Sequence, residues 1–255
     1  MTIEREERPQ LLHLLLDLGE SMLRSGAEIQ RIEDTMMRLG SAYGAQQTNV
    51  FAITSSIILT VTFPDGEVRT QTRRIRGAGA TDFTRLEEMN RLSRRVCARP
   101  IPLKALGRAI HTRTLPEHPA TLYAGSVLAA MGFAVFFGGT LWDGLMAALF
   151  ALVICLLKRC LAPLCPNNVV FYFFCSLLVG GGICAAVRLS PVFHLDKVMI
   201  GDIMLLIPGL ALTNSIRDIF VGDTISGIMR LTESLLWAGA LASGFMIAIM
   251  LLGGG

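Results

Sequence analysis

The residues best suited to chemistry lie in one apolar stretch, Gly201–Asp218, towards the carboxyl end of the 255-residue chain. An ionisable residue, Asp202, stands near its start, and Pro208 and Gly209 follow each other in its middle. Proline has no backbone N–H and its ring clashes with the carbonyl four residues earlier, so a helix here must kink or break. Glycine adds backbone freedom at the same point. The stretch therefore predicts a broken helix with an acid beside it.

Such a helix has two interpretations. Backbone groups freed at membrane depth are tolerated only against protein or a water-filled cavity, and broken helices with an ionisable residue nearby are typical of transporter substrate sites. The alternative is a proline kink that only shapes packing. The stretch alone leaves both open.

Charged and polar side chains at either end of the break are the candidate site residues. Asp202 could carry a proton or bind a cation, or it could be an interfacial residue if the membrane span starts at Ile203. Asn214, Arg217 and Asp218 follow the break, and a guanidinium can hold a carboxylate through two parallel hydrogen bonds. For Arg217 and Asp218, a loop at the lipid headgroups is the alternative.

The composition divides the chain at about residue 118. Residues 1–118 hold 17 of the 23 Lys and Arg and 14 of the 20 Asp and Glu, whereas apolar runs dominate residues 119–255. We expect a cytosolic α+β domain over 1–118 and an all-α membrane bundle over 119–255. The net charge of +3 is too small and too mixed with acids to indicate a nucleic-acid partner. Residues 1–10 are charged and lack the pattern of a secretory signal, so we expect the first domain to stay in the cytosol.

The sequence shows no pattern of a catalytic or metal site. None of the six cysteines forms a C-x-x-C pair, and we expect them to be reduced packing residues, with a metal site at Cys160 and Cys165 the weaker alternative. We find no glycine-rich phosphate loop, nucleophile elbow or paired histidine ligands. These patterns predict no enzymatic activity, no cofactor and no metal.

Within the first domain, apolar spacing predicts two helices, then strands at about 49–53, 57–63 and 67–75, then a helix after Asp82 with Phe83 inward. Ser25 and Glu28 have the spacing of a capping box between the first two helices, which would explain Glu28 structurally. Arg31 and Glu33 fall off the apolar stripe and are expected on a solvated face. The arginines of the last strand (Arg69, Arg73 and Arg74) either bind an anion or, as we favour, keep an edge strand from aggregating.

The second domain carries five apolar segments, each close to the ~20 residues that span a bilayer. They lie near residues 120–138, 144–161, 169–187, 198–216 and 233–252. With the amino-terminal domain inside, five spans place the carboxyl terminus outside, and Lys158 and Arg159 fall in a cytosolic loop as the positive-inside tendency prefers. Transporters with alternating access usually have two related halves, and no second copy of the Pro208 segment occurs here. We therefore expect a second subunit.

Several segments together resemble the threonine/serine exporter family. The most specific is Leu206–Asp218, with the sequence LIPGLALTNSIRD. The weaker matches are the segments GDTISG, RLTE, SGAE with RIE, NRLSR and FGGTLWD, at residues 222–227, 230–233, 25–28 with 31–33, 90–94 and 137–143. The resemblance covers about residues 10–252. Long family members carry ten spans in one polypeptide, so this chain resembles the first, larger subunit of the split form.

The resemblance implies a bacterial inner-membrane secondary exporter of threonine and serine, driven by the proton motive force, that works with a small second membrane subunit. Some split members are associated with dicarboxylates such as succinate, which is the alternative substrate class, and a higher oligomer is left open. Pro208, Gly209, Asn214, Arg217 and Asp218 match the family pattern, as does Asp223, and with Asp202 they are the expected substrate or transport residues. A membrane-anchored regulatory or sensory protein is the alternative from another functional class.

Overall fold

The computed structural model describes residues 3–75, 82–112 and 119–253. These residues form two compact units. Unit 1 comprises Met1–Pro116 together with Thr213–Leu231, and unit 2 comprises Glu117–Leu212 together with Thr232–Gly255. Residue 118, where we predicted the domain boundary, lies outside the described residues, so that boundary stays a prediction. The segment Thr213–Leu231, which we had assigned wholly to the membrane domain, packs within unit 1.

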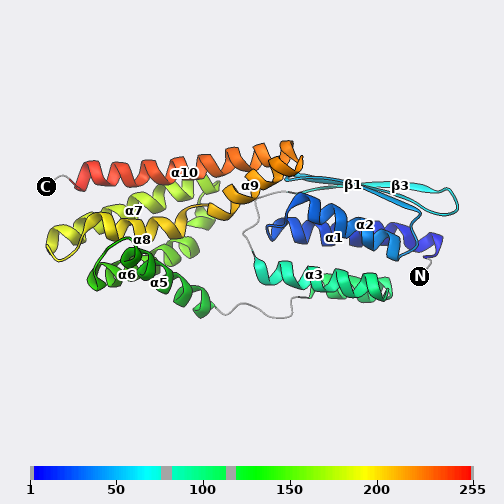
Figure 1. The fold of residues 1–255 in the computed structure, drawn as a ribbon, viewed down its shortest axis with the longest axis horizontal. Helices are drawn as coiled ribbons and strands as arrows, with labels where there is room; N and C mark the ends of the chain where they lie inside the picture. Colours follow the sequence, from blue (N-terminus) through cyan, green and yellow to red (C-terminus); the bar gives the residue numbers. More distant parts are fainter. Residues whose placement is uncertain (1–2, 76–81, 113–118, 254–255) are drawn as a thin grey trace. The chain divides into compact units, whose positions relative to one another are not determined.

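Unit 1 is built of three layers, with the pair α1 and α2 between a small sheet and the pair α3 and α4 (Figure 1). The sheet is antiparallel, in the order β1-β2-β3. The elements of the amino-terminal part are η1 (Arg5–Glu7), α1 (Arg8–Arg24), α2 (Ile29–Ala42), β1 (Gln47–Ile53), β2 (Ser56–Thr62), β3 (Val68–Arg74), α3 (Phe83–Ala98) and α4 (Leu103–His111).

The predicted strands are confirmed, and the reason is a period of two. Ile57, Leu59 and Val61 on β2 are buried against the helices, while the residues between them are exposed or half-buried. The strand β3 is an edge strand, and two of its three arginines are matched by carboxylates: Arg69 pairs with Glu67, and Arg73 with Asp17 and Glu20. This pairing fits the interpretation of a charged edge strand better than that of an anion site.

Three local expectations were wrong. Ser25 and Glu28 form no capping box: the Ser25 N–H closes the end of α1 on Ser21 and Met22, and no side chain caps α2. Phe83 is not inward, since 62% of it is exposed. Glu33 is not solvated, because it is half-buried and its Oε1 accepts the Ala52 N–H at 2.8 Å.

Two helices complete unit 1 from the far end of the sequence. The end of α9 (Gly209–Val221) turns into the start of α10 (Thr224–Leu252) through Gly222, whose φ of +104° favours glycine. The helices then run close together, because a Cβ at Gly227 would stand 2.8 Å from the Ser215 carbonyl oxygen. Helix α10 is continuous from Thr224.

Unit 2 is a bundle of apolar helices, and the helices available to cross a membrane differ from the prediction. Its elements, besides the later part of α10, are α5 (Pro119–Phe136), α6 (Leu141–Cys160), η2 (Ala162–Leu164), α7 (Asn168–Leu189) and α8 (Leu195–Leu206). Among the described residues, three helical segments are long and apolar enough to span: Leu141–Leu164, Asn168–Leu189 and Thr224–Leu252. The apolar helix Ala120–Phe136 is shorter, and the predicted span at 198–216 is divided between α8 and α9.

Close helix packing in unit 2 depends on small residues. A Cβ at Gly244 of α10 would stand 2.5 Å from the Phe173 carbonyl oxygen of α7. A second set of contacts in unit 2 is polar and is named here the latch. Asp143, which is fully buried, forms a capping box with Thr140, and its carboxylate accepts a hydrogen bond from the backbone N–H of His194 at 2.7 Å. The latch ties the start of α6 to the segment just before α8.

Candidate functional site

The seven predicted site residues divide between the two units. Asp202, Pro208 and Gly209 belong to unit 2, whereas Asn214, Arg217, Asp218 and Asp223 belong to unit 1. Each group is therefore described within its own unit.

The break at Pro208 is present. Helix α8 ends at Leu206, Ile207 takes an extended ψ of 128°, and α9 starts at Gly209. The Gly209 N–H donates to the Ile207 carbonyl at 2.8 Å, and Leu212 begins the new helical ladder by donating to Pro208. The prediction of a broken helix is confirmed, for the reason the sequence gave: proline lacks the donor and the room that a continuous helix requires.

Asp202 is fully buried within unit 2, and neither carboxylate oxygen has a hydrogen-bond partner among the described residues. The helix that carries it is held tightly, since a Cβ on the preceding residue, Gly201, would stand 2.7 Å from the Ala130 carbonyl oxygen of α5. This burial disfavours the interfacial interpretation. An ionised carboxylate without a partner in such a place costs several kcal/mol, so the protonated form is cheaper there.

Asp218 is also buried, and although its Oδ2 makes no hydrogen bond among the described residues, it has an ion-pair partner. Arg230 Nη1 of α10 lies 3.2 Å from Asp218 Oδ2, and the two side chains are 14% and 3% exposed. The same guanidinium donates from Nη2 to the Ala27 carbonyl at 3.2 Å, on the link between α1 and α2. Arg230 therefore connects α9, α10 and the amino-terminal domain.

A second pair lies beside the first. Arg217 Nη1 lies 2.9 Å from Glu28 Oε1, the residue immediately before α2, and the Arg217 side chain is 61% exposed. Glu28 is the acid that we had explained as part of a capping box. Its partner comes instead from a segment almost 190 residues later in the sequence, so local spacing could not have revealed it.

Two further acids extend the group. The carboxylate of Glu33 has a raised pKa, chiefly because of burial, with the Ala52 N–H opposing the rise and the negative charge of Asp223 adding to it. Asp223 itself is half-buried and continues the turn after α9 by donating its N–H to the Asp218 carbonyl at 2.9 Å. Asn214 is half-buried, and its side chain has no hydrogen-bond partner in the part of the chain that the structure describes.

The structure thus brings three of the seven predicted residues into one group with three others. We name this group the junction cluster: Glu28, Glu33, Arg217, Asp218, Asp223 and Arg230. It holds four acids and two arginines, so its formal charge is −2 at neutral pH. Within the described ranges no three His, Cys, Asp or Glu side chains are arranged to hold a metal ion. The arrangement can make and break ion pairs with a charged ligand or partner, and we see no nucleophile and base in it.

The comparison with known families identifies the chain. A family model described as "Putative threonine/serine exporter" (ThrE) matches residues 13–252. The chain belongs to the threonine/serine exporter family. Membership in this family and the apolar helices make it a membrane protein of transport function, as the sequence resemblance predicted.

Relatives within the family differ in length. The chain is 25% identical over 248 residues to a probable threonine/serine exporter of Mycobacterium tuberculosis and 24% identical over 253 residues to a threonine/serine exporter of Corynebacterium glutamicum. Each match covers 94% of this chain but only 46% and 51% of those exporters, so the chain spans about half their length. It is 24% identical over 257 residues to the probable succinate transporter subunit YjjP of Klebsiella aerogenes, covering 99% of this chain and 98% of that subunit. No solved structure matches the chain.

Proposed function

We propose that this chain is the larger subunit of a two-subunit secondary exporter of small carboxylate metabolites in the bacterial inner membrane. The observation that carries the proposal is the helix broken at Pro208, with an unpaired buried acid before the break and the junction cluster after it. Half-helix ends at such a break present partial charges to a carboxylate or an ammonium group. The amino-terminal part of unit 1 is proposed to lie in the cytosol.

The lengths of the relatives favour a second subunit. The chain corresponds to nearly all of a protein described as a transporter subunit and to about half of proteins described as exporters. A second, short membrane protein would supply the remaining half. We propose five passages of the membrane, with α8 and α9 together making the fourth and the carboxyl terminus outside.

For the substrate we propose threonine and serine, and a dicarboxylate such as succinate is the second candidate. The family description favours the amino acids, whereas the end-to-end match to a succinate transporter subunit favours the dicarboxylate. Both classes carry a carboxylate that a guanidinium can bind. Arg217 is the proposed contact, because its side chain is 61% exposed although it also touches Glu28.

Asp202 is the proposed coupling residue for the proton motive force. A carboxyl group that is buried, lacks a partner and stands next to a helix break can alternate between a proton-bound form and an ionised form as its surroundings open. This role is a proposal that rests on burial and the missing partner alone.

The test is export from cells that lack other exporters and that express this chain with a candidate short membrane protein of the same family. Cells are loaded with labelled serine or labelled succinate, and efflux is compared with that of cells expressing either protein alone. We expect efflux of one substrate only when both proteins are present. Arg217→Ala should raise the internal substrate concentration needed for half-maximal efflux, whereas Arg91→Ala, on exposed α3 surface, should not. Equal efflux of both substrates with and without the chain would refute the proposal.

A further inference from the structure

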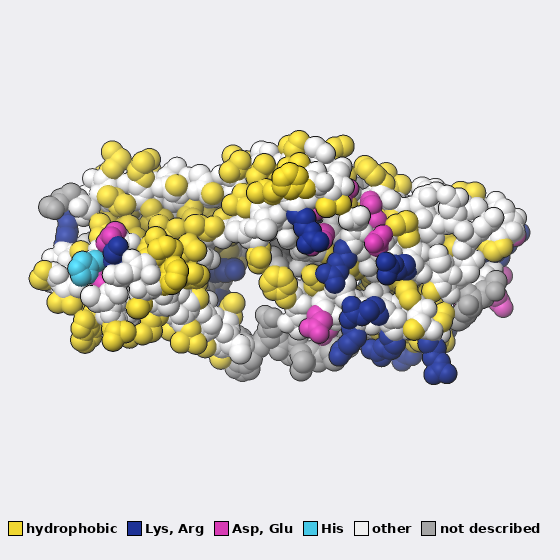
Figure 2. Space-filling model, viewed as in Figure 1, with side chains coloured by type: hydrophobic (Ala, Val, Ile, Leu, Met, Phe, Trp, Pro, Cys, Tyr) yellow, Lys and Arg dark blue, Asp and Glu magenta, His cyan; other side chains and the backbone are white. Residues whose placement is uncertain are grey.

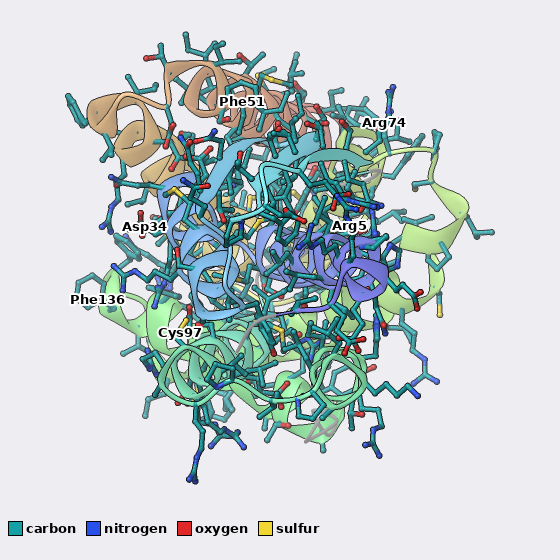
Figure 3. All side chains as sticks on the ribbon, turned by 90° about the vertical axis from the view of Figure 1, so that its right-hand side faces the viewer. Arg5, Asp34, Phe51, Arg74, Cys97 and Phe136 are labelled. Carbon is teal, nitrogen blue, oxygen red and sulfur yellow. The ribbon has the colours of Figure 1, made fainter. Side chains whose placement is uncertain are left out.

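A pocket of about 510 Å³ lies in unit 1 between α2 and α3, and no residue of the junction cluster lines it. Its walls carry Arg31 and Arg38 from α2 and Arg94 from α3. Figure 3 labels Asp34 of α2 and Cys97 of α3, one from each wall, on the same side of the unit. On the face drawn in Figure 2, Lys and Arg side chains gather over the part of unit 1 where α2 and α3 lie. The pocket therefore lies in the most basic part of that face.

The charge of the pocket is not balanced from within. Arg31 and Arg94 have no carboxylate within ion-pair distance among the described residues, and Arg38 reaches Asp34 only at 4.0 Å. Three guanidinium groups and one carboxylate leave a formal charge of +2. Arg8 and Arg73, elsewhere in unit 1, each pair with an acid at 2.8 Å. The three pocket arginines are exposed, and each has donors left for a ligand in the pocket.

The floor of the pocket is polar and buried. Asn90 and Ser93 of α3 line it and are only 8% and 7% exposed. The Ser93 hydroxyl donates to the Asn90 carbonyl at 3.0 Å, but the Asn90 side-chain amide has no hydrogen-bond partner among the described residues. The Asn90 amide is thus free to bond water or a ligand that enters the pocket. A ligand that accepts or donates one hydrogen bond at this place would satisfy it.

The remaining wall residue argues for binding rather than reaction. Burial raises the pKa of the Cys97 thiol, against a smaller opposing effect of the Arg38 charge, so the thiol is protonated at neutral pH. A protonated thiol is a poor nucleophile. No histidine lines the pocket. The residues of the pocket therefore favour a site that binds through charge and hydrogen bonds.

We propose that the pocket between α2 and α3 is a binding site for a small dianion, a phosphate ester or a dicarboxylate, held by Arg31, Arg38 and Arg94 with the Asn90 amide beneath. Guanidinium groups bind both kinds of oxyanion through paired hydrogen bonds. The volume is in the range of small-molecule sites. The site is separate from the junction cluster and does not depend on the proposed transport function, so it gives the cytosolic part of the chain a ligand of its own.

The test uses the purified full-length chain in detergent, with thermal unfolding and titration calorimetry at constant ionic strength so that screening stays fixed. Inorganic phosphate and succinate are the two probes, and threonine, which has no net charge, is the reference. We expect at least one dianion to bind saturably and to raise the unfolding temperature. Threonine should do neither. Phosphate alone would assign a phosphate ester, and succinate alone would assign a dicarboxylate.

The matched variants decide whether binding occurs in the pocket. Arg31→Gln and Arg94→Gln should each weaken binding at least tenfold, and Asn90→Ala should weaken it by a smaller factor. Arg95→Gln, one residue further along α3 and exposed outside the pocket, should leave binding within twofold of the wild type. Binding that is absent, does not saturate, or is equally strong in Arg31→Gln and Arg94→Gln would overturn the proposal.

Discussion

Two buried aspartates in this chain have opposite surroundings. Asp218 of unit 1 lies 3.2 Å from a guanidinium that also reaches the amino-terminal domain. Asp202 of unit 2 is as deeply buried, yet neither of its oxygens has a partner among the described residues. A paired acid joins elements together, and an unpaired one destabilises the fold that contains it. The first is therefore expected to serve structure, and the second to be kept for function.

The largest expected effect comes from removing the unpaired acid. Asp202→Asn should reduce efflux of the transported substrate to the background of cells without the chain. The same change should leave the free energy of unfolding unchanged or raise it by up to about 2 kcal/mol, because a neutral amide is less costly to bury than a charge. Efflux from cells and thermal unfolding of the purified chain measure the two effects.

Its control is Asp196→Asn, on the same helix but exposed. That variant should keep both normal efflux and normal stability. If Asp202→Asn exports at the wild-type rate, the coupling role is wrong. If it instead unfolds more easily than the wild type, Asp202 has a structural partner and the contrast with Asp218 fails.

An intermediate effect is expected from breaking the paired acid. Arg230→Met leaves Asp218 buried without its counter-charge and removes the hydrogen bond to Ala27, which should destabilise the chain by about 3 kcal/mol. Asp218→Asn should cost less, since Arg230 keeps its bond to the Ala27 carbonyl. In the double variant much of the loss should return, and a double-mutant cycle from thermal unfolding gives the coupling energy. Additive losses would mean that the pair does not contribute to stability.

The smallest effect is a difference in pH dependence between acids of unit 1. Burial raises the pKa of Glu33, so the folded chain holds this proton more tightly than the unfolded chain. The contribution of the protonated carboxyl group to stability is lost as pH rises through the raised pKa. Hydrogen bonds from Arg8 lower the pKa of Asp65, so its contribution is present above the ordinary value of about 3.9 and is lost as pH falls through the lowered pKa. Unfolding temperatures of the full chain from about pH 3 to pH 8 measure both. The unfolding temperature of Glu33→Gln should rise relative to that of the wild type as the pH rises from about 4.3. The unfolding temperature of Asp65→Asn should approach that of the wild type as the pH falls.

The sequence predicted those features whose cause is local. The break at Pro208 follows from the missing N–H of one residue, and the three strands follow from alternation along short segments. The sequence left open whether Asp202 is buried or interfacial, because an apolar helix does not reveal which of its faces meets protein. The predicted span at 198–216 is divided between α8 and α9, and the first apolar helix, Ala120–Phe136, is shorter than predicted. These two differences explain why three rather than five helices meet the length criterion for spanning.

What the sequence could not predict is long-range pairing. Glu28 and Arg217, and Ala27 and Arg230, are separated by about 190 and 203 residues, and no spacing rule connects them. Glu28 was therefore explained by the nearest available rule, the capping box, which the backbone geometry contradicts. The prediction for Phe83 was wrong for a related reason. The apolar spacing of its helix places it on the inward stripe, but it is the first residue of α3, and its side chain is exposed there.

The contacts at Ala27 and Glu28 have a mechanical consequence. Two contacts, at Ala27 and at Glu28, fix the short link before α2 to α10 and α9. The start of α2 therefore cannot rotate independently of the α9–α10 turn. Arg31 of the anion pocket lies three residues beyond Glu28, about 5 Å along the helix axis. A displacement at Glu28 is therefore transmitted along α2 to Arg31. A displacement of α9 that separates Arg217 from Glu28 would release α2, and an anion that holds α2 against α3 would resist that displacement by the same amount of free energy.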